Sequence, residues 1–591
     1  MAEEKSSKNQ KSIDLKNTSF MGALCSGDIE EDIILPFPKM SDDEKATLKA
    51  IFDSLNSLLK DRDADYRKWD REGEMPPEFL QQLRELGLFS LIIPEAEGGM
   101  GLSSSAYSRV VQELSKYDGS VALTVGAHNS IGMRGLVLFG NAEQKARFYP
   151  KLASGEMIAA FCLTEPGAGS DAASIKTKAV RDGSDWILNG NKMWITNGGI
   201  ADFMTVFART EGPGGQMTAF IVTGDMAGLT RGHHEDKMGL RASSTTTLSF
   251  DNMRIPAANV LGEVGKGFKV AMKILNSGRT GLGGGCVGGM KRAIELATKQ
   301  AKERVQFDKP ISEYGLVKQK LGHMMVECYA VESAVGMVAG LVDQGYEDYA
   351  VEAAISKVFA SECMWRTIDE ALQIAGGNGF SCEFPYERMM RDCRVNRIFE
   401  GTNEILRLFI ALTAMNSVGK QLKELSSSLE GIFKDPIKGF GVLSDYAQRR
   451  AANAGVGFMA KKGAFTKIHP VLRKHAEIFE EGTRDLAGAA DRILRKHGRN
   501  IIGKQFATKR LADIMIDLFV LSCVISRVNS AITETGVDQC KHELSIINTF
   551  AGQVRRRVKG NFGKIDDNDD EAIKSLAEHA YEVEKYKWDL V

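Results

Sequence analysis

The sequence has little that would bind nucleic acid, hold a structural metal or build a disulfide framework. Lys and Arg number 76 and Asp and Glu 77, so the formal net charge is −1 and no global attraction to nucleic acid is implied. The nine cysteines form no C-x-x-C pair and the nine histidines show no zinc spacing. We therefore expect a reducing compartment, no metal and no nucleic-acid partner.

Targeting signals are also scarce. The first twenty residues are polar and carry acids, unlike the apolar core of a secretory signal or an Arg-rich, acid-poor transit peptide. No apolar run approaches the ~20 residues of a membrane span. We expect a soluble cytoplasmic protein with an N-terminal arm over residues 1–40, of which about 35 residues are disordered.

Hydrophobic periodicity divides the 591-residue chain into four further regions. Apolar residues recur at three- and four-residue spacing over 41–160, 267–415 and 416–591, which predicts helical domains. Short alternating runs over 161–266 predict a small β domain. The fold is therefore expected to be mainly α with a small β domain.

Three parts of the middle region have clear strand character. Residues 186–199 are expected to form two short strands around the Asn189-Gly190 turn, because Asn-Gly is the commonest tight-hairpin pair. Residues 218–222 suit a buried strand, and 245–255 alternate as a half-buried strand does.

Three long motifs stand in a fixed order. They are Phe161–Asp171 (FCLTEPGAGSD), Trp194–Gly199 (WITNGG), and Gln373–Gly379 (QIAGGNG) with Ile398–Thr402 (IFEGT). In order and spacing they resemble the acyl-CoA dehydrogenase family over roughly residues 40–415. The C-terminal region resembles the very-long-chain branch of that family. The resemblance implies a helical N-terminal domain, a β-barrel-like middle domain, a four-helix-bundle domain and an extra helical C-terminal domain.

The resemblance also implies FAD as cofactor. Leu163 and Thr164 would address the polar edge of the flavin, and Ser170 its pyrophosphate. Trp194 would pack against the isoalloxazine, with the Thr196 hydroxyl near the nitrogen that accepts hydride. The other residues implied on this side of the cofactor are Phe161, Gly169, Thr402 and Glu404. Without the resemblance, the glycine loop would be a plain tight turn and the Trp a core residue.

A second group of residues is implied to reach the FAD of a neighbouring subunit, which would make a homodimer obligatory. Arg304 suits a pyrophosphate through its forked donors, and Phe307 can pack on adenine. Gln306, Gln373 and Gly377 are the other implied contacts. The alternative for the first three is an ordinary helix-ending loop stopped by Pro310.

Glu400 is the candidate catalytic residue. It stands among apolar neighbours, and a carboxylate that loses hydration has a pKa raised toward neutrality, as a general base needs. The run alone equally fits a surface glutamate at a helix start, stabilised by the dipole, with Thr402 and Asn403 as capping residues. The resemblance favours the base, which removes the α-proton of an acyl-CoA thioester while the β-hydrogen passes to FAD as hydride.

Some relatives carry the base one residue before a substrate-contacting arginine. Here that position is Gly278, which has no side chain to take a proton, and Arg279 follows it. Arg279, Asn276, Ser170 and Gly401 are the implied substrate contacts. A buried ion pair is the alternative role for Arg279.

Two further glycine positions and one histidine need interpretation. Gly283–Gly288 fits G-x-G-x-x-G, but a helical segment precedes it, so we reject a dinucleotide-binding reading and expect close helix packing. Gly126 is expected to leave room for a long acyl chain. His128 is expected to be a hydrogen-bonded core residue.

Residues 431–470 hold seven basic and two acidic residues with interleaved Phe. Such a stretch can lie on an anionic membrane surface, and the long-chain relatives are membrane-associated through a comparable region. A flexible Gly/Ala-rich connector is the alternative.

The sequence thus predicts a homodimeric FAD-dependent dehydrogenase of long-chain acyl-CoA that passes electrons to electron-transferring flavoprotein. An oxygen-using acyl-CoA oxidase and a non-catalytic assembly protein of the same family are the alternatives. We expect a cytoplasmic protein, peripheral on the inner membrane face if 431–470 binds lipid, or a mitochondrial-matrix protein if the chain is eukaryotic and already processed.

Overall fold

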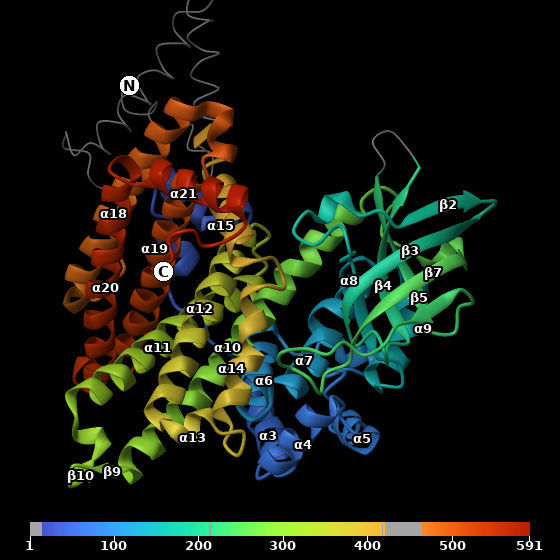
Figure 1. Cartoon of the computed structure of the whole chain (residues 1–591), viewed down its shortest axis with the longest axis horizontal. Coiled ribbons are helices and arrows are strands. Elements are labelled where there is room, and N and C mark those ends of the chain that lie inside the picture. Colours follow the sequence, from blue (N-terminus) through green and yellow to red (C-terminus); the bar gives the residue numbers. More distant parts are fainter. Residues whose placement is uncertain (1–14, 212–215, 417, 420–463, 591) are drawn as a thin grey trace, which may run out of the picture. The chain divides into compact units, whose positions relative to one another are not determined.

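The structure is a computed structural model that describes residues 15–211, 216–416, 418–419 and 464–590. The chain divides into two units (Figure 1). The first comprises residues 1–17 and 36–405, and the second comprises residues 18–35 and 406–591. The predicted mainly helical fold with a small β domain is confirmed, whereas the exact division into five domains stays a prediction.

The first unit begins with helices whose starts are capped by polar side chains. Ser41, Ser103 and Asp118 each accept hydrogen bonds from backbone N–H groups of the following turn, as N-caps do. Leucines of these helices pack into one core with Trp69 and Phe79. The elements are α3 (Asp42–Leu59), α4 (Asp63–Glu72), α5 (Pro77–Glu85), α6 (Ser104–Tyr117), α7 (Gly119–Ala127), the π-helical η3 (His128–Gly132), α8 (Arg134–Phe139) and α9 (Ala142–Ala153).

His128 is a core residue, as predicted. Its Nδ1 accepts a hydrogen bond from Ala159 N at 2.9 Å, which leaves Nε2–H to donate to the carbonyl of Phe89 at 2.9 Å. Burial lowers its pKa to about 4, so the ring is neutral.

The middle of the first unit is an eight-stranded mixed sheet in the order β6-β7-β3-β2-β4-β5-β8, with β1 paired to β4. Strand β5 matches the predicted run and β7 has the predicted bounds. The strands are β1 (Ala159–Cys162), β2 (Lys178–Asp182), β3 (Asp185–Thr196), β4 (Phe203–Thr210), β5 (Met217–Thr223), β6 (Leu229–Arg231), β7 (Thr245–Ile255) and β8 (Val260–Leu261).

The predicted hairpin at Asn189-Gly190 is wrong. Strand β3 runs straight through this pair and bulges against β7 between Leu188 and Gly190. A Cβ on Gly190 would lie 2.7 Å from the backbone Cα of Thr177, so the glycine permits a close approach of two backbones. Gly190 therefore serves close packing at a bulge. An Asn-Gly pair can occur both at such a bulge and in a turn, so the sequence alone did not separate the two.

Long helices complete the first unit. In α10, a Cβ on Gly284 would meet the backbone oxygen of Ser108 at 2.9 Å, and one on Gly288 that of Gln112 at 2.0 Å. Gly283–Gly288 therefore lets α10 pack against α6, as expected. The elements are α10 (Gly267–Glu303), the hairpin β9 (Val305–Gln306) and β10 (Lys309–Pro310), α11 (Gly315–Asp343), α12 (Ala350–Ala375), α13 (Gly377–Phe380) and α14 (Tyr386–Cys393). Helix α15 (Asn403–Ala414) leads into the second unit.

Helix α11 is long and apolar enough to span a membrane, contrary to the expectation from the sequence. By length and composition it could cross a bilayer, but 67% of its most apolar window is buried inside the protein. That burial is typical of a core helix.

The second unit is a helical bundle that includes part of the N-terminal arm. Phe20 stacks on Phe479 and meets Phe519 edge-on, and Ser526 donates to the carbonyl of Ile34. The expectation of disorder is therefore wrong for residues 18–35, whose apolar side chains fill this core. The elements are α1 (Phe20–Cys25), α2 (Glu31–Ile34), α18 (Arg473–His497), α19 (Gln505–Thr535), α20 (Lys541–Asp566) and α21 (Asp570–Val583). The stretch 431–470 lies outside the described residues apart from 464–470.

Candidate active site

Glu400 occupies a strained turn between α14 and α15. Its φ is +58°, and that of Gly401 is +90°. A left-handed conformation is uncommon for any residue with a Cβ, and such strain gathers at functional sites. The residue is half-buried, but its Oε2 atom is inaccessible to solvent and has no hydrogen-bond partner among the described residues. A buried carboxylate oxygen with no partner from the described chain is typical of a site that binds a ligand.

The carboxylate of Glu400 lies against α10 at Gly278. A Cβ on Gly278 would stand 2.8 Å from Glu400 Oε2 and 2.7 Å from Ile131 Cγ2. The position that carries the base in some relatives and the carboxylate of Glu400 thus adjoin each other. Any side chain at this position would force Glu400 or Ile131 to move.

Burial raises the pKa of Glu400 to about 7, and the positive charges of Arg279 and Lys357 act against that rise. A base that titrates near the working pH combines a useful ionised fraction with proton affinity. The predicted electrostatic setting of a general base is present.

Arg279 lies one residue further along α10 and is buried. Its Nη1 donates to Asn276 Oδ1 at 2.9 Å, and its Nε donates to the backbone carbonyl of Glu400 at 3.4 Å. The structure thus joins three of the predicted site residues. The charge of Glu400 also acts on Arg279, so both the substrate contact and the buried ion pair remain open as its role.

The loop after β1 is fixed by a buried ion pair that the sequence did not reveal. Lys192 donates to Glu165 Oε1 at 2.7 Å and to the carbonyl of Leu163 at 3.1 Å. The Glu165 carboxylate also accepts from the backbone N–H of Thr177 at 3.0 Å. Burial disfavours the charge on Lys192, but the ion pair offsets this cost and ties β3 to the loop. In the sequence, only the opposite charges of Glu165 and Lys192 hinted at this pair.

Trp194 and Thr196 lie beside this loop. The N–H of Met193, directly before the second motif, donates to the carbonyl of Thr164 in the first motif at 2.9 Å. Trp194 is 54% exposed with φ +59°, at a bulge in β3, and is therefore not the core residue expected for an average Trp. Ser170 and Gly169 are exposed on the loop, while Leu163 is buried and Phe161 and Thr164 are half-buried.

The glycines of this loop are not needed for an unusual backbone conformation. Neither Gly167 nor Gly169 has a positive φ, so neither needs the left-handed region. A Cβ on Gly167 would meet nothing within 4 Å. This open space lets a bound group approach the backbone of the loop.

The residues predicted to reach a neighbouring subunit face outward. Phe307, at the tip of the β9–β10 hairpin, is 88% exposed, and Phe380 at the end of α13 is 84% exposed. Arg304, Gln306, Gln373 and Gly377 are exposed as well. Near the base, Thr402 Oγ1 caps α15 by accepting from Ile405 N at 3.3 Å, and Glu404 is exposed.

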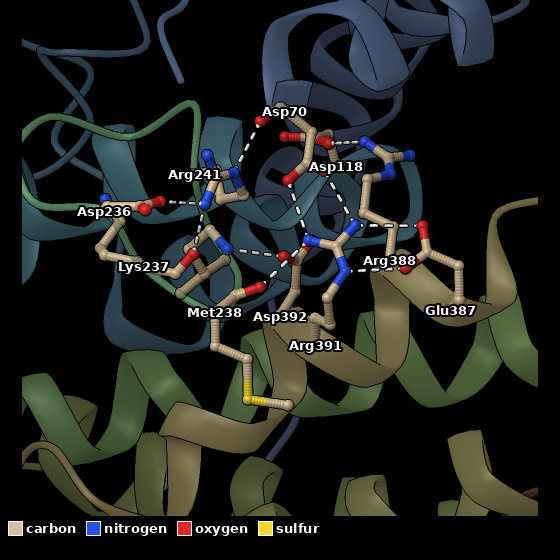
Figure 2. Close-up of polar contacts among 11 residues, drawn as sticks. Asp70, Asp118, Asp236, Lys237, Met238, Arg241, Glu387, Arg388, Arg391 and Asp392 are labelled. Atoms are coloured by element: carbon tan, nitrogen blue, oxygen red, sulfur yellow. Dashed lines mark hydrogen bonds and ion pairs between the residues drawn. The ribbon is translucent and has the colours of Figure 1, made fainter. Parts of the chain in front are cut away.

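A cluster of buried charges fixes the helix that precedes Glu400 (Figure 2). On α14, Arg388 pairs with Asp118, the N-cap of α7, and Arg391 pairs with Asp70 of α4 at 2.8 Å. Asp392 accepts from the backbone N–H of Leu240 at 2.6 Å, and burial raises its pKa to about 7. These contacts join α14 to two helices and to the loop before β7.

Models of known protein families match most of the chain. Three family models match in order: "Acyl-CoA dehydrogenase, N-terminal domain" over 45–156, "middle domain" over 160–253 and "C-terminal domain" over 265–415. A fourth, "ACAD9/ACADV, C-terminal domain", matches 470–586. The chain belongs to the acyl-CoA dehydrogenase family. It is therefore an FAD-dependent acyl-CoA dehydrogenase.

Individual relatives agree with the family models. The chain is 41% identical to the very long-chain specific acyl-CoA dehydrogenase, mitochondrial, of Homo sapiens, over 92% of this chain and 84% of the relative. The crystal structure of an acyl-CoA dehydrogenase complexed with FAD from Bacillus anthracis has a TM-score of 0.79 at 32% identity, covering 96% of this chain and 95% of that one. A structure described as the electron transferring flavoprotein of Acidaminococcus fermentans has a TM-score of 0.61 at 34% identity, covering 63% and 98%.

The residues of this acyl-CoA dehydrogenase fit its cofactor. An exposed Trp194 presents a planar apolar surface, and the open space at Gly167 leaves the loop backbone approachable. Flavin rings and tryptophan both favour stacked contacts. Phe161, Leu163, Thr164, Gly169, Ser170, Trp194 and Thr196 would hold FAD from this side.

Proposed function

We propose that this protein dehydrogenates long-chain acyl-CoA thioesters to trans-2-enoyl-CoA in fatty-acid β-oxidation, with Glu400 as the base. The observation that carries the proposal is the buried, unpartnered Oε2 of Glu400 packed against Gly278. The long-chain specificity rests on the very long-chain relatives and on the matching C-terminal domain.

Glu400 Oε2 takes the α-proton of the thioester in this proposal. Its pKa of about 7 leaves much of the residue ionised at neutral pH, and its burial strengthens its electrostatic contacts. Bound FAD would supply the hydride acceptor for the β-hydrogen. The base therefore needs to hold only the proton that leaves the neighbouring carbon.

The backbone of Glu400 supplies a second function. Its N–H donates to no acceptor in the described part of the chain. A free N–H beside the base can meet the negative charge that develops on the thioester oxygen as the α-proton leaves. The N–H and the carboxylate both belong to Glu400, whose backbone adopts the left-handed conformation.

Substrate contacts are proposed for four residues. Arg279 and Asn276 form one hydrogen-bonded unit on α10 that joins the backbone of Glu400, and Gly401 follows the base. Ser170 is exposed on the loop after β1. Arg279 would interact with the CoA arm through guanidinium donors that remain charged at any working pH.

A homodimer is proposed because two large aromatic side chains are exposed and would be buried in an interface. Phe307 and Phe380 are large, apolar and almost fully exposed. A second subunit would shield them and would receive Arg304, Gln306, Gln373 and Gly377 at its FAD. Thr402 and Glu404 remain proposed cofactor contacts.

Electron-transferring flavoprotein is the proposed acceptor, in line with the family and with the Acidaminococcus fermentans structure. The mitochondrial relatives support a matrix location if the chain is eukaryotic. Membrane contact through 431–470 remains a proposal that liposome co-sedimentation would test.

The test is anaerobic mixing of the purified flavoprotein with palmitoyl-CoA while flavin absorbance is followed. Wild type should bleach, and Glu400→Gln should bleach more slowly by roughly a thousandfold, the scale of general-base catalysis. Full-rate bleaching by Glu400→Gln would refute the assignment of the base. Stoichiometric peroxide formation in air would favour the oxidase alternative instead.

A further inference from the structure

Lys357 is a buried cation next to the base that the proposed mechanism does not use. It lies on α12 and has no exposed surface. Its Nζ donates to the carbonyl of Gly401 at 2.8 Å and to Asn403 Oδ1 at 2.8 Å. Gly401 follows Glu400 directly and Asn403 begins α15. One side chain therefore holds both ends of the short turn behind the base.

Two features make this place unfavourable for a lysine. The hydrogen-bond partners of its ammonium group are neutral oxygens, so no direct ion pair within the described part of the chain offsets the cost of burial. The group also lies at the N-terminus of α15, where the helix dipole favours anions over cations. A charge with such a cost indicates an effect on a neighbouring group.

That neighbour is Glu400. Burial lowers the pKa of Lys357 to about 8, and the Glu400 charge is the largest influence against this fall. From α10, Cys286 also opposes it and Arg279 reinforces it, while Glu362 of α12 opposes it. In return, Lys357 and Arg279 hold the pKa of Glu400 down against the effect of burial.

Asn403 makes the contact rigid. It is fully buried, and its Nδ2 donates to Ser361 Oγ at 3.0 Å and to Glu362 Oε1 at 3.2 Å. Lys357 and Ser361 are four residues apart on α12, so they share one face of the helix. This face thereby engages both ends of the Asn403 amide, and the turn cannot shift without breaking several hydrogen bonds.

We propose that Lys357 is a positioning residue for proton abstraction: it fixes the turn behind Glu400 and supplies the positive charge that keeps the base ionised. The role rests on the proposed function of Glu400. It differs from that of Arg279, which contacts the carbonyl of Glu400 from α10 and is a proposed substrate contact.

Three variants separate position from charge. Lys357→Gln keeps hydrogen-bond donors but removes the charge, Lys357→Arg keeps the charge, and Lys357→Met removes both. Single-turnover flavin bleaching by palmitoyl-CoA is measured from about pH 6 to about pH 9, around the pKa of the base. For Gln and Met we expect the midpoint of the rate profile to rise by about one pH unit, because an opposite charge nearby lowers a carboxyl pKa by about that much or more. Arg should restore the wild-type midpoint, and Met should also lower the limiting rate.

The matched control is Lys320→Met. Lys320 pairs with Glu370, which lies on α12 about 20 Å along the helix from Lys357. Loss of this surface pair should leave the pH profile unchanged. A midpoint that moves equally in this control would overturn the proposal.

A second readout does not need turnover. Glu400→Gln is combined with Lys357→Gln, and thermal midpoints are compared over the same pH range. Without the lysine charge, the gain in thermal midpoint that Glu400→Gln produces above pH 7 should become larger. An unchanged gain together with an unchanged rate profile would refute the role of Lys357. If wild type itself is not bleached by palmitoyl-CoA, it is the proposed function that fails, while the thermal comparison still decides the effect of the lysine on Glu400.

Discussion

Replacing the base by its neutral isostere should make the protein inactive and more stable. Burial raises the pKa of Glu400 from 4.5 to about 7. Since one pKa unit corresponds to about 1.4 kcal/mol, keeping this carboxyl ionised in the folded protein costs about 3 kcal/mol. Glu400→Gln mimics the protonated form and removes that cost.

The direction in which the stability difference changes with pH follows from the protonation of Glu400 in the folded and unfolded chains. Below pH 4.5 the carboxyl is protonated in both the folded and the unfolded chain, so the two proteins should differ little. Between pH 4.5 and about 7 the unfolded wild type releases a proton that the folded wild type keeps, so wild-type stability falls with rising pH relative to the variant. Above about pH 7 the stability difference between Glu400→Gln and wild type reaches its full size.

The expected shift is large enough to measure. For a unit of this size the entropy of unfolding is about 0.8 kcal/mol/K, so 3 kcal/mol corresponds to a thermal midpoint about 4 °C higher. Differential scanning calorimetry of the flavin-loaded proteins at about pH 5 and about pH 8.5 would measure it. Glu97→Gln, at an exposed glutamate, is the control for the loss of one carboxylate. A difference between Glu400→Gln and wild type that is constant, or that shrinks as pH rises, would refute the burial argument.

Three further predictions rest on other contacts. Gly278→Ala would place a Cβ 2.8 Å from Glu400 Oε2, so turnover of palmitoyl-CoA should fall at least tenfold while flavin content is retained; unchanged turnover would contradict the close packing. Gly126→Phe should shorten the preferred acyl chain in an assay over chain lengths, and an unchanged profile would exclude Gly126 from the acyl site. Asp392→Asn should gain thermal stability relative to wild type as pH rises from about 4 to about 8, because burial raises the pKa of this carboxyl; a loss with rising pH would show that its bond to Leu240 N requires the charged form.

The architecture was predictable because periodicity and motif order act over many residues. The bounds of β7 and the helical nature of the Gly283–Gly288 segment follow from alternation and from the surrounding apolar spacing. The error at Gly190 shows the limit of this approach. Asn-Gly favours a turn locally, but pairing with β7 and the close approach of Thr177 decide the outcome, and those contacts are not local in the sequence.

The buried lysines were not predictable in the same way. Lys192 and Lys357 stand in segments that read as an ordinary strand and an ordinary amphipathic helix, where a lysine normally faces solvent. Each becomes functional only through partners that the chain brings together from afar, at Glu165 and at Asn403. A single sequence records neither the burial nor the partner.

Trp194 and Glu400 share a property that connects strain to chemistry. Both adopt positive φ without being glycine, at +59° and +58°. Local preference alone would place glycine at either site, because only glycine enters this region without steric cost. At the first position glycine would remove the exposed ring proposed to face the flavin, and at the second it would remove the carboxylate. The surrounding contacts therefore have to impose both conformations: the bulge of β3 at one, and the Lys357–Asn403 clamp at the other. Strain at the reacting groups and buried charge behind them are thus two parts of one arrangement, in which tertiary contacts stabilise what the local sequence disfavours.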